Sequence, residues 1–504
     1  NIKFFSLILR RFSIILKGNY FDTQLASHLI NPELKNNNIY YLNLTYLGKE
    51  ILVLEDLTGK GRNKINVESI PLDKIFYYSV QNIDACFKLK MFLKNKLKEL
   101  NLLKYYKEIE LPMIPVLHDM EYNGTYIDAE LLFKMSNKLG NEINKLTNNI
   151  YQLSGIEYNI NSSQQLANIL FDVLKLPQIK KRSTAEDILK KLSSYHELPN
   201  YIIKYRKYNK LKNTYIDSLP ELINNHTKRI HTTFNQTIAS TGRLSSTNPN
   251  FQNIPIRTQE GKEIRKAFRC QNKGWKILSA DYSQVELRIM AHISEDPSLV
   301  SAFKSGNDIH SETASKVFKV PLDSVLPEMR RKAKIVNFGI MYGAGPFRMS
   351  QELGIPRHEA IFLIESYFKQ YSGIKSYINK VLEQAREKQY VRTLLGRRRP
   401  ILDANSNNGL RRKAAERMAI NMPIQGSAAE MIKIAMFSIS KSIKKNKLKS
   451  KMVLQIHDEL LFEYPIEEED ILLKLVIEKM ENAIQLSVPL IIDYGIGDNW
   501  YDAH

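Results

Sequence analysis

Two aspartates far apart in the sequence each stand at the end of a predicted strand. Residues 275–280 have the pattern of a strand that delivers Asp281, and residues 285–293 that of the helix after it. Downstream, residues 451–464 have the pattern of a hairpin with Asp458 in its turn. If the strand ends meet, the two carboxylates can share a pair of Mg²⁺ ions about 3.5–4 Å apart, an arrangement suited to moving nucleotides. A lone aspartate at a strand end is more often a turn or cap residue, so the prediction rests on the pair.

A basic and aromatic stripe lies between the two acidic elements. Four side chains recur at every fourth position and so share one face of a predicted helix: Arg330, Lys334, Phe338 and Tyr342. Fixed cations suit phosphate oxygens and an aromatic ring can pack on a base or sugar, so one helix could hold a whole nucleotide. The alternative is an amphipathic helix with a solvated basic end. Gly339 and Gly343 count against it, because each weakens a helix by about 1 kcal/mol relative to Ala and indicates close approach to the backbone.

From about residue 105 to its end, the chain resembles the DNA polymerases of family A, the group of bacterial DNA polymerase I. The elements above occur in the family's order, with a segment at 240–255 similar to the primer–template segment and a helix at 416–427 similar to the template-contacting helix. The resemblance implies an α/β multi-domain protein with the right-hand polymerase fold of palm, fingers and thumb. Among plastid-targeted members, the chain resembles the apicoplast DNA polymerase of malaria-type parasites, which fits its frequent Asn, Lys, Ile and Tyr.

The resemblance divides the chain into five segments. Residues 1–104 resemble an RNase H-like 3′–5′ exonuclease domain that is truncated and precedes the polymerase. Residues 105–230 correspond to the thumb, whose clearest predicted helices lie at 128–153 and 163–174. The palm is expected in two parts, at 231–290 and 440–504. Mainly helical fingers are expected between them, at 291–439.

The first segment departs from the exonuclease pattern where metal ligands should stand. Phe5 takes the place of the aspartate in the family's Asn-x-x-x-Asp motif, and Asn82 that of the aspartate in Tyr-x-x-x-Asp. The Asp-x-Glu motif would lie before residue 1. Because a two-metal nuclease needs these anionic oxygens, we expect this segment to be inactive. Asp84 could substitute only if the alignment shifts by two residues.

The resemblance also assigns roles to single residues of the polymerase part. Asp281, Asp458 and the backbone carbonyl of Tyr282 are expected to bind two Mg²⁺ ions, with Glu459 as a supporting third acid. Lys334 is expected to protonate the leaving pyrophosphate. The expected nucleotide-binding residues are Arg330, Lys334, Phe338, Tyr342, His310 and Glu286. The expected DNA-binding residues are Arg243, Arg417, Asn421, Gln425, Gln455 and His457.

The implied activity is template-directed addition of dNTPs to a primer 3′-OH with release of pyrophosphate, in organellar genome replication or repair. Primer-template DNA and dNTPs are the expected partners, with a helicase or primase as further candidates, no membrane and a monomeric state. A single-subunit RNA polymerase of the phage type is one alternative, but Glu286 resembles the family's gate against a ribose 2′-OH. A non-catalytic DNA-binding protein on the same fold is the other, and the two aspartates argue against it.

Composition agrees with a nucleic-acid partner. The chain has 73 Lys and Arg against 53 Asp and Glu, a formal charge of +20, which implies a polyanionic partner or an anionic surface. Basic residues interleave with Tyr and Asn at 201–215 and do not form a polybasic block beside an apolar segment, which favours nucleic acid. Cys86 and Cys270 are expected to be reduced thiols of an intracellular protein. The apicoplast-type resemblance separately implies an organelle, an apicoplast or other plastid. Arg10 and Arg11 interrupt the apolar start, and we expect a processed or cut chain.

Overall fold

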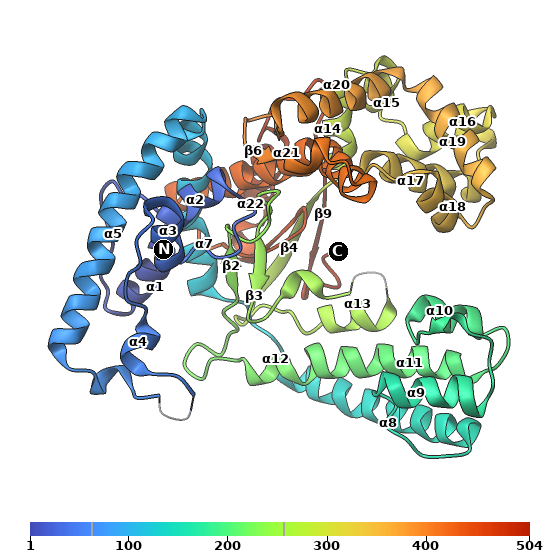
Figure 1. Ribbon diagram of the computed structural model, residues 1–504, viewed down its shortest axis with the longest axis horizontal. Helices are drawn as coiled ribbons and strands as arrows, with labels where there is room; N and C mark the ends of the chain where they lie inside the picture. The colour runs from blue at the N-terminus through green and yellow to red at the C-terminus, as the bar shows by residue number, and fades with distance from the viewer. Residues whose placement is uncertain (62–63, 256–257) are drawn as a thin grey trace. The chain divides into compact units, whose positions relative to one another are not determined.

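The computed structural model describes residues 1–61, 64–255 and 258–504 (Figure 1). The chain divides into two compact units. The first comprises Asn1–Tyr122, Thr233–Thr247 and Ala280–Tyr494, and the second Asn123–Thr232, Asn248–Ser279 and Gly495–His504. Residues 62–63 of the expected exonuclease-like segment and 256–257 of the expected palm lie outside the described residues. In the described part of the chain, no helix combines the length and apolar character needed to cross a membrane.

The described residues of the 1–104 segment form helices and loops, with no strand. The elements are α1 (Ile2–Arg11), α2 (Thr23–Ile30), α3 (Ile39–Leu47), α4 (Leu54–Thr58), η2 (Val67–Ser69), α5 (Leu72–Glu99) and the start of α6 (Leu103–Tyr105). Leu25, Leu42 and Leu89 are buried where α2, α3 and α5 pack together. The sheet of an RNase H-like domain is therefore not among the described residues of this segment, and that assignment is not confirmed.

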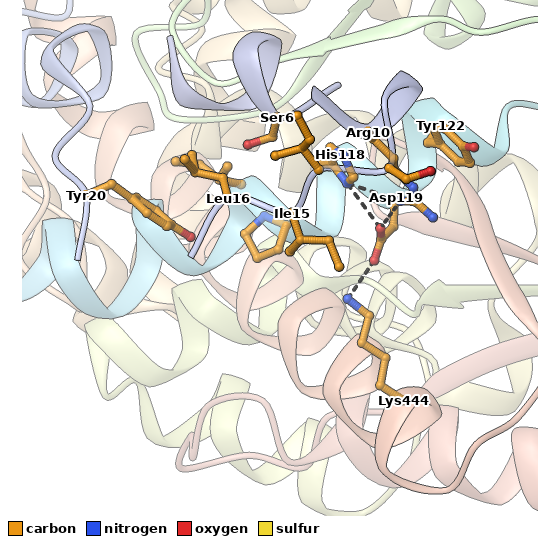
Figure 2. Close-up of a pocket in the computed structure, with 13 residues that line it drawn as sticks. Ser6, Arg10, Ile15, Leu16, Tyr20, His118, Asp119, Tyr122 and Lys444 are labelled. Atoms are coloured by element: carbon orange, nitrogen blue, oxygen red, sulfur yellow. Dashed lines mark hydrogen bonds and ion pairs between the residues drawn. The ribbon is translucent and has the colours of Figure 1, made fainter. Parts of the chain in front are cut away.

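Asp119 ties α1 to two later helices of the first unit. It lies on α7 (Leu111–Asn123), which continues from η3 (Tyr106–Glu110). Its carboxylate accepts from Arg10 of α1 at 2.7 Å and from Lys444, near the end of α21 (Gly409–Lys445), at 2.6 Å (Figure 2). Burial alone would raise the pKa of Asp119, but hydrogen bonds from His118 and Lys444 hold it well below its usual value. These side chains line a cavity of about 560 Å³.

A four-stranded sheet carries the two acidic strand ends. Its order is β7 (Lys451–Ile456), β8 (Glu459–Pro465), β4 (Trp275–Tyr282) and β9 (Ile492–Gly497). β7 and β8 are antiparallel and form the predicted hairpin, with Ile456 opposite Glu459. Every residue of β8 is buried, Glu459 and Glu463 included, which explains why the apolar residues of the strand do not alternate with exposed polar ones. A second hairpin, β2 (Thr233–Asn235) and β3 (Ser245–Thr247), brackets the loop that carries Arg243.

The predicted helical segment at 291–439 is mainly helical, as expected. Helices α14 (Val285–Ser294) and α17 (Pro327–Met341) carry four of the six expected nucleotide-binding side chains, Tyr342 is the C-cap residue of α17, and one small hairpin interrupts the helices. The other elements of the first unit are α15 (Pro297–Lys304), α16 (Ile309–Phe318), η7 (Leu322–Ser324), α18 (Pro346–Leu353), α19 (Arg357–Gln370), α20 (Ser372–Lys388), β5 (Tyr390–Arg392), β6 (Arg398–Pro400), η8 (Leu402–Asn405), η9 (Ile466–Glu468) and α22 (Glu469–Glu481).

The second unit is mostly a helical bundle around a core of its own. Its elements are α8 (Ala129–Ser154), α9 (Ser163–Asn168), η4 (Ile169–Val173), β1 (Ile179–Arg182), α10 (Glu186–Leu192), α11 (Leu198–Leu211), η5 (Lys212–Ile216), α12 (Ser218–Glu221), η6 (Phe251–Asn253) and α13 (Gln259–Arg265). Helices α8 and α11 run side by side (Figure 1), and Ile150, Leu166 and Ile202 are buried in the core. Asp128 caps the start of α8 by accepting from the Leu131 amide at 2.9 Å.

Candidate active site

The ends of β4 and β8 bring Asp281 and Asp458 together. The backbone amide of Tyr282, the residue after Asp281, donates to the backbone carbonyl of Asp458 at 3.3 Å. This hydrogen bond places the two aspartates in neighbouring segments. Asp281 lies on β4, while Asp458 lies in the turn between β7 and β8, as predicted. The buried ring of Tyr282 anchors the strand end, since its hydroxyl donates to the Met480 carbonyl at 2.7 Å. Burial raises the pKa of Asp458, against the opposing charges of Arg243 and His457.

Glu286 connects the acidic pair to the basic and aromatic helix. Gln284 adopts a left-handed conformation (φ 52°) that turns the chain from β4 into α14, and Glu286 lies in the first turn of that helix with only 6% of its surface exposed. One carboxylate oxygen accepts from the Arg243 guanidinium at 2.5 Å and the other from the Tyr342 hydroxyl at 2.6 Å. Arg243 also lies 3.9 Å from the Asp458 carboxylate. Burial raises the pKa of Glu286, and the charge of Arg243 opposes this shift.

The stripe of α17 lies on one face, as its spacing predicts. Arg330 and Lys334 are exposed, Phe338 is half-buried, and its ring stacks on that of Tyr342, with centroids 6.2 Å apart. The two glycines mark close approaches by other side chains of the protein. A Cβ at Gly339 would lie 2.5 Å from Met349 of α18, and one at Gly343 would lie 3.1 Å from Arg417 of α21. The close approach inferred from these glycines is confirmed, but side chains of the protein supply it, so the glycines do not favour nucleotide binding over the amphipathic-helix alternative.

Arg330 is paired with an acid that the sequence did not point to. Its guanidinium makes two hydrogen bonds to the Asp308 carboxylate, at 3.0 and 2.7 Å. Asp308 also caps α16 by accepting from the Ser311 amide at 2.7 Å. Although burial opposes the shift, hydrogen bonds from Arg330 and Ser311 lower the pKa of Asp308 to about 2, so the carboxylate is charged at neutral pH.

His310 is buried behind Phe338 and is held in a defined orientation. Asn337 of α17 lies 3.0 Å from its Nδ1, and the rings of His310 and Phe338 are 5.8 Å apart. Burial lowers the pKa of His310 to about 4, so the ring is neutral near pH 7. If the Asn337 amide donates to Nδ1, the proton of the neutral ring resides on Nε2, which is then a donor.

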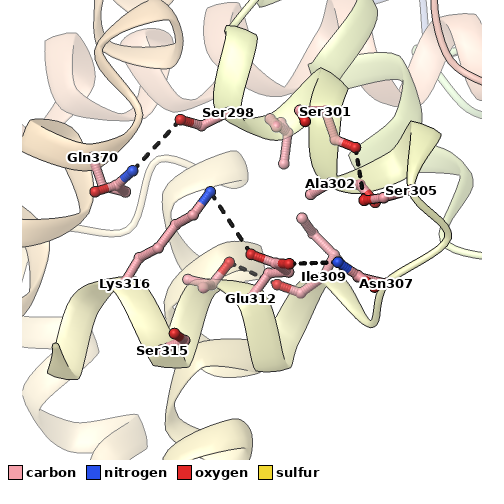
Figure 3. Close-up of polar contacts among 12 residues, drawn as sticks. Ser298, Ser301, Ala302, Ser305, Asn307, Ile309, Glu312, Ser315, Lys316 and Gln370 are labelled. Atoms are coloured by element: carbon pink, nitrogen blue, oxygen red, sulfur yellow. Dashed lines mark hydrogen bonds and ion pairs between the residues drawn. The ribbon is translucent and has the colours of Figure 1, made fainter. Parts of the chain in front are cut away.

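The first turns of α16, which carry Asp308 and His310, are braced by polar contacts. Glu312 accepts from Asn307 at 2.7 Å and pairs with Lys316 at 3.8 Å (Figure 3). Gln370 of α19 donates to Ser298 of α15 at 3.5 Å in the same region. The two contacts of Glu312 brace the first turns of α16, whose start presents Asp308 toward Arg330.

Apart from Arg243, which lies in the loop between β2 and β3, the expected DNA-binding residues fall into two groups. Arg417, Asn421 and Gln425 lie four positions apart on α21 and line a pocket of about 450 Å³ together with Tyr342. Gln455 and His457 instead belong to the β7–β8 hairpin, where the Gln455 side-chain amide donates to the His457 carbonyl. Glu459, the expected third acid, is buried at the start of β8.

The donor set at the strand ends fits Mg²⁺. Two carboxylates and a neighbouring backbone carbonyl are hard oxygen ligands, and Mg²⁺ is commonly held by one or two carboxylates with substrate phosphates and water. Among residues 1–61, 64–255 and 258–504, no group of three or more His, Cys, Asp or Glu side chains is arranged as a metal cluster. The protein would therefore supply a partial coordination sphere.

Comparison with known proteins identifies the family. Residues 129–502, most of the chain, match the family described as DNA polymerase family A. The chain belongs to DNA polymerase family A. This family A chain is 41% identical to DNA polymerase I of Pseudomonas aeruginosa over 97% of its own length and 54% of that protein, and 42% identical to DNA polymerase I of Bacillus subtilis over 98% and 56%. It thus spans about half the length of the curated relatives it matches.

A solved structure shares the fold. The POL domain of Pol1 from M. smegmatis, in complex with DNA primer-template and dNTP, matches this family A chain with a TM-score of 0.92 and 37% sequence identity. The match covers 100% of this chain and 86% of that one. The predicted family is therefore confirmed. The relatives named here are bacterial, so the apicoplast-type resemblance is not.

Proposed function

We propose that this chain is a template-directed DNA polymerase that adds dNTPs to a primer 3′-OH and releases pyrophosphate. The observation that carries the proposal is the run of contacts from Asp458 through Arg243 and Glu286 to Tyr342, which joins the acidic strand ends to the phosphate-binding helix. The DNA polymerase I relatives and the DNA-bound solved domain support it.

Two Mg²⁺ ions are the proposed cofactors. Asp281, Asp458 and the backbone carbonyl of Tyr282 would hold them, with Glu459 supporting the site from β8. When bound, such ions lower the pKa of a hydroxyl nucleophile and neutralise charge on the β and γ phosphates. The raised pKa of Asp458 supports this assignment, because a buried carboxylate is stabilised in its charged form by a cation.

The side chains of α17 and α16 would bind the nucleotide. Arg330 and Lys334 present cations for phosphate oxygens, and Lys334 is the proposed donor of a proton to the leaving pyrophosphate. The neutral His310 would donate from Nε2 to a phosphate oxygen. Glu286 and Phe338 would contact the sugar, while Tyr342 lies near the position proposed for the template base.

DNA would be held by the remaining polar residues of the site. Arg243, Arg417, Asn421, Gln425, Gln455 and His457 are the proposed contacts to the terminal duplex, through minor-groove acceptors common to correct pairs. The palm at 231–290 and 440–504, the fingers at 291–439 and the thumb at 105–230 follow from the same proposal. We also propose a monomeric state and a helicase or primase as a partner. Both proposals rest on the sequence alone.

Proofreading is proposed to be absent in this chain. Phe5 is exposed on α1, and the Asn82 side chain donates to the Tyr78 carbonyl at 2.8 Å within α5, so neither supplies an anionic oxygen. Asp84, the conceivable substitute, is exposed and pairs with Lys88 one helical turn away. The organellar setting rests only on the apicoplast-type resemblance and on the frequent Asn, Lys, Ile and Tyr. A full-length transcript would test it by showing whether a targeting leader is encoded.

Primer extension by metal-ligand variants tests the proposed function. Asp281→Ala and Asp458→Ala should each lose extension by at least about 10³-fold, while primer–template affinity changes little because it comes from many phosphate contacts. Asp187→Ala, an exposed acid on α10, is the matched control and should extend normally. Extension by either site variant within tenfold of wild type would overturn the two-metal assignment. Efficient use of rNTPs by the wild type would favour the RNA polymerase alternative. A wild type that does not extend primers at all would favour the non-catalytic DNA-binding protein.

A further inference from the structure

A group of buried charges lies beneath the loop that carries Arg243. Glu110 of η3 accepts from Arg397 at 3.0 Å and from Lys433 of α21 at 2.8 Å, and each of the three side chains is about 1% exposed. Charges buried this deeply are costly unless they are paired. An apolar cluster could fill the same space. The buried ion pairs therefore indicate that the neighbouring segments must be held in a defined position.

The loop of the β5–β6 hairpin is fastened to α21. The Leu394 amide donates to the Ser427 hydroxyl at 2.9 Å, and the Leu395 amide donates to the Glu430 carboxylate at 3.2 Å. The Arg397 amide donates to the Thr393 hydroxyl at 2.9 Å, and that hydroxyl donates to Glu430. Arg397 therefore projects from a rigid support.

Arg397 lies directly against Gly242, the neighbour of Arg243. A Cβ at Gly242 would lie 3.0 Å from Nε and Cζ of Arg397, and the backbone there has a φ of +85°. On the same side, a Cβ at Gly426 of α21 would lie 3.3 Å from the Thr241 carbonyl oxygen. The loop thus packs against the guanidinium of Arg397 and against α21. At Gly242 and at Gly426 the contact leaves no room for a methyl group.

Glu110 also holds the beginning of this segment. Nε2 of Gln236, just after β2, donates to the Glu110 carbonyl at 3.0 Å and to its carboxylate at 2.8 Å. The segment from 236 to 242 is therefore fixed at both ends by one buried pair. Beyond it, Arg243 contacts Glu286 and approaches Asp458.

We propose that the Glu110–Arg397 pair positions Arg243, by holding the 236–242 segment so that its guanidinium meets Glu286 and Asp458. Arg397 acts through Gly242 and touches neither DNA nor nucleotide in this assignment. The effect on extension rests on the proposed polymerase function, whereas the effect on the loop does not.

Hydrogen exchange tests the loop without relying on activity. The Gly242 amide donates to the Ala239 carbonyl at 2.9 Å, so its exchange reports whether the turn is held. Arg397→Lys keeps the charge that pairs with Glu110 but removes the planar surface, and it should speed exchange at 239–244 by about tenfold or more while the β7–β8 hairpin is unchanged. Arg392→Lys, the same change in β5 of this hairpin, is the control and should leave 239–244 unchanged.

A double-mutant cycle tests whether Arg397 acts through Arg243. Arg397→Lys should lower kcat by about tenfold in the wild type but by less than about twofold in an Arg243→Ala background. Should Arg397→Lys fail to fold, Gly242→Ala disturbs the same contact from the other side and should give the same two results. The proposal would be overturned if the losses in kcat from Arg397→Lys and Arg243→Ala were independent and multiplied. It would also be overturned if a folded Arg397→Lys variant exchanged at 239–244 at the rate of the wild type. If the wild type does not extend primers, the proposed polymerase function fails. The hydrogen-exchange result alone then tests whether Arg397 holds the loop that carries Arg243.

Discussion

The hydroxyl of Tyr342 donates to the carboxylate of Glu286 at 2.6 Å, across 56 positions of sequence. Arg243 occupies the other oxygen of that carboxylate, so both oxygens have protein partners. Glu286 is therefore a buried carboxylate whose orientation is fixed by two side chains of the protein itself. It forms a fixed wall of the site.

This wall predicts selection against a ribose 2′-OH. Glu286→Ala should lower the preference for dNTP over rNTP by at least about tenfold, since it removes the group proposed to fill the 2′ space, and should also reduce dNTP use. Tyr342→Phe removes the hydroxyl but keeps the carboxylate, and should change the preference much less. Incorporation of single dNTPs and rNTPs measures both. An unchanged ratio in Glu286→Ala would place the gate elsewhere.

Phe338 predicts discrimination against dideoxynucleotides. By family resemblance, a phenolic hydroxyl at this position replaces the contact of the missing 3′-OH to the triphosphate. Phe338→Tyr should therefore raise ddNTP incorporation by about tenfold or more with little change for dNTPs. Phe347→Tyr on α18, where the ring is exposed, is the matched control. Equal ddNTP use by all three proteins would contradict the assignment.

The pairing of Arg330 with Asp308 predicts competition with the triphosphate. Asp308→Asn removes the charge but keeps a good helix cap, so α16 should remain intact. The freed Arg330 should lower the KM for dNTP by up to about fivefold, equivalent to about 1 kcal/mol for an exposed pair. Glu328→Gln breaks the similar exposed pair with Arg331 and should leave KM unchanged. A raised KM in Asp308→Asn would show that Asp308 orients Arg330 and does not compete for it.

The buried neutral His310 predicts loss of stability in mild acid. Its pKa is about 4 in the fold against an ordinary 6.5, so as pH falls from 6.5 to 4 the unfolded state gains a proton that the folded state does not. That difference is on the order of 3 kcal/mol, lost progressively through this window. Urea unfolding of His310→Gln should be less pH-dependent there, and the exposed His358→Gln should behave like wild type. His28, whose pKa burial lowers to about 3, contributes in the same direction.

The lack of a carboxylate at Phe5 and Asn82 predicts no proofreading by this chain. A 3′-mismatched primer incubated with Mg²⁺ and no dNTP should keep its length, while a matched primer with dNTPs is extended. Metal-dependent shortening from the 3′ end would contradict the expectation, and its loss in Asp84→Ala would assign the activity to that residue.

Elements with a local period were predictable from the sequence. The apolar run before Asp281, the hairpin around Asp458 and the four-residue spacing on α17 are properties of neighbouring residues, and the structure forms all three. The helix predicted from residue 163 likewise begins there, as α9. These patterns sufficed to place most expected site residues on the right kind of element.

The missed contacts join distant parts of the chain. Glu110 and Arg397 are separated by 287 positions, and no periodicity relates them. Asp308 resembles any helix cap, and its pairing with Arg330 depends on how α16 packs on α17. Asn337 lies off the predicted stripe, and its role becomes visible only with His310 beside it. Tertiary packing creates such pairs, so only a structure reveals them.

Helix α21 spans 37 residues and carries both Arg417 and the buried Lys433. At 1.5 Å per residue these two side chains are separated by about 24 Å along the axis, so a tilt of about 3° at Lys433 would move Arg417 by about 1 Å. A displacement of that size is enough to spoil catalytic geometry. Under the proposed function, the accuracy of base-pair reading depends on the mechanical stiffness of this helix. Substitutions deep in the interior, far from any ligand, are then expected to lower copying fidelity while every contact residue stays unchanged.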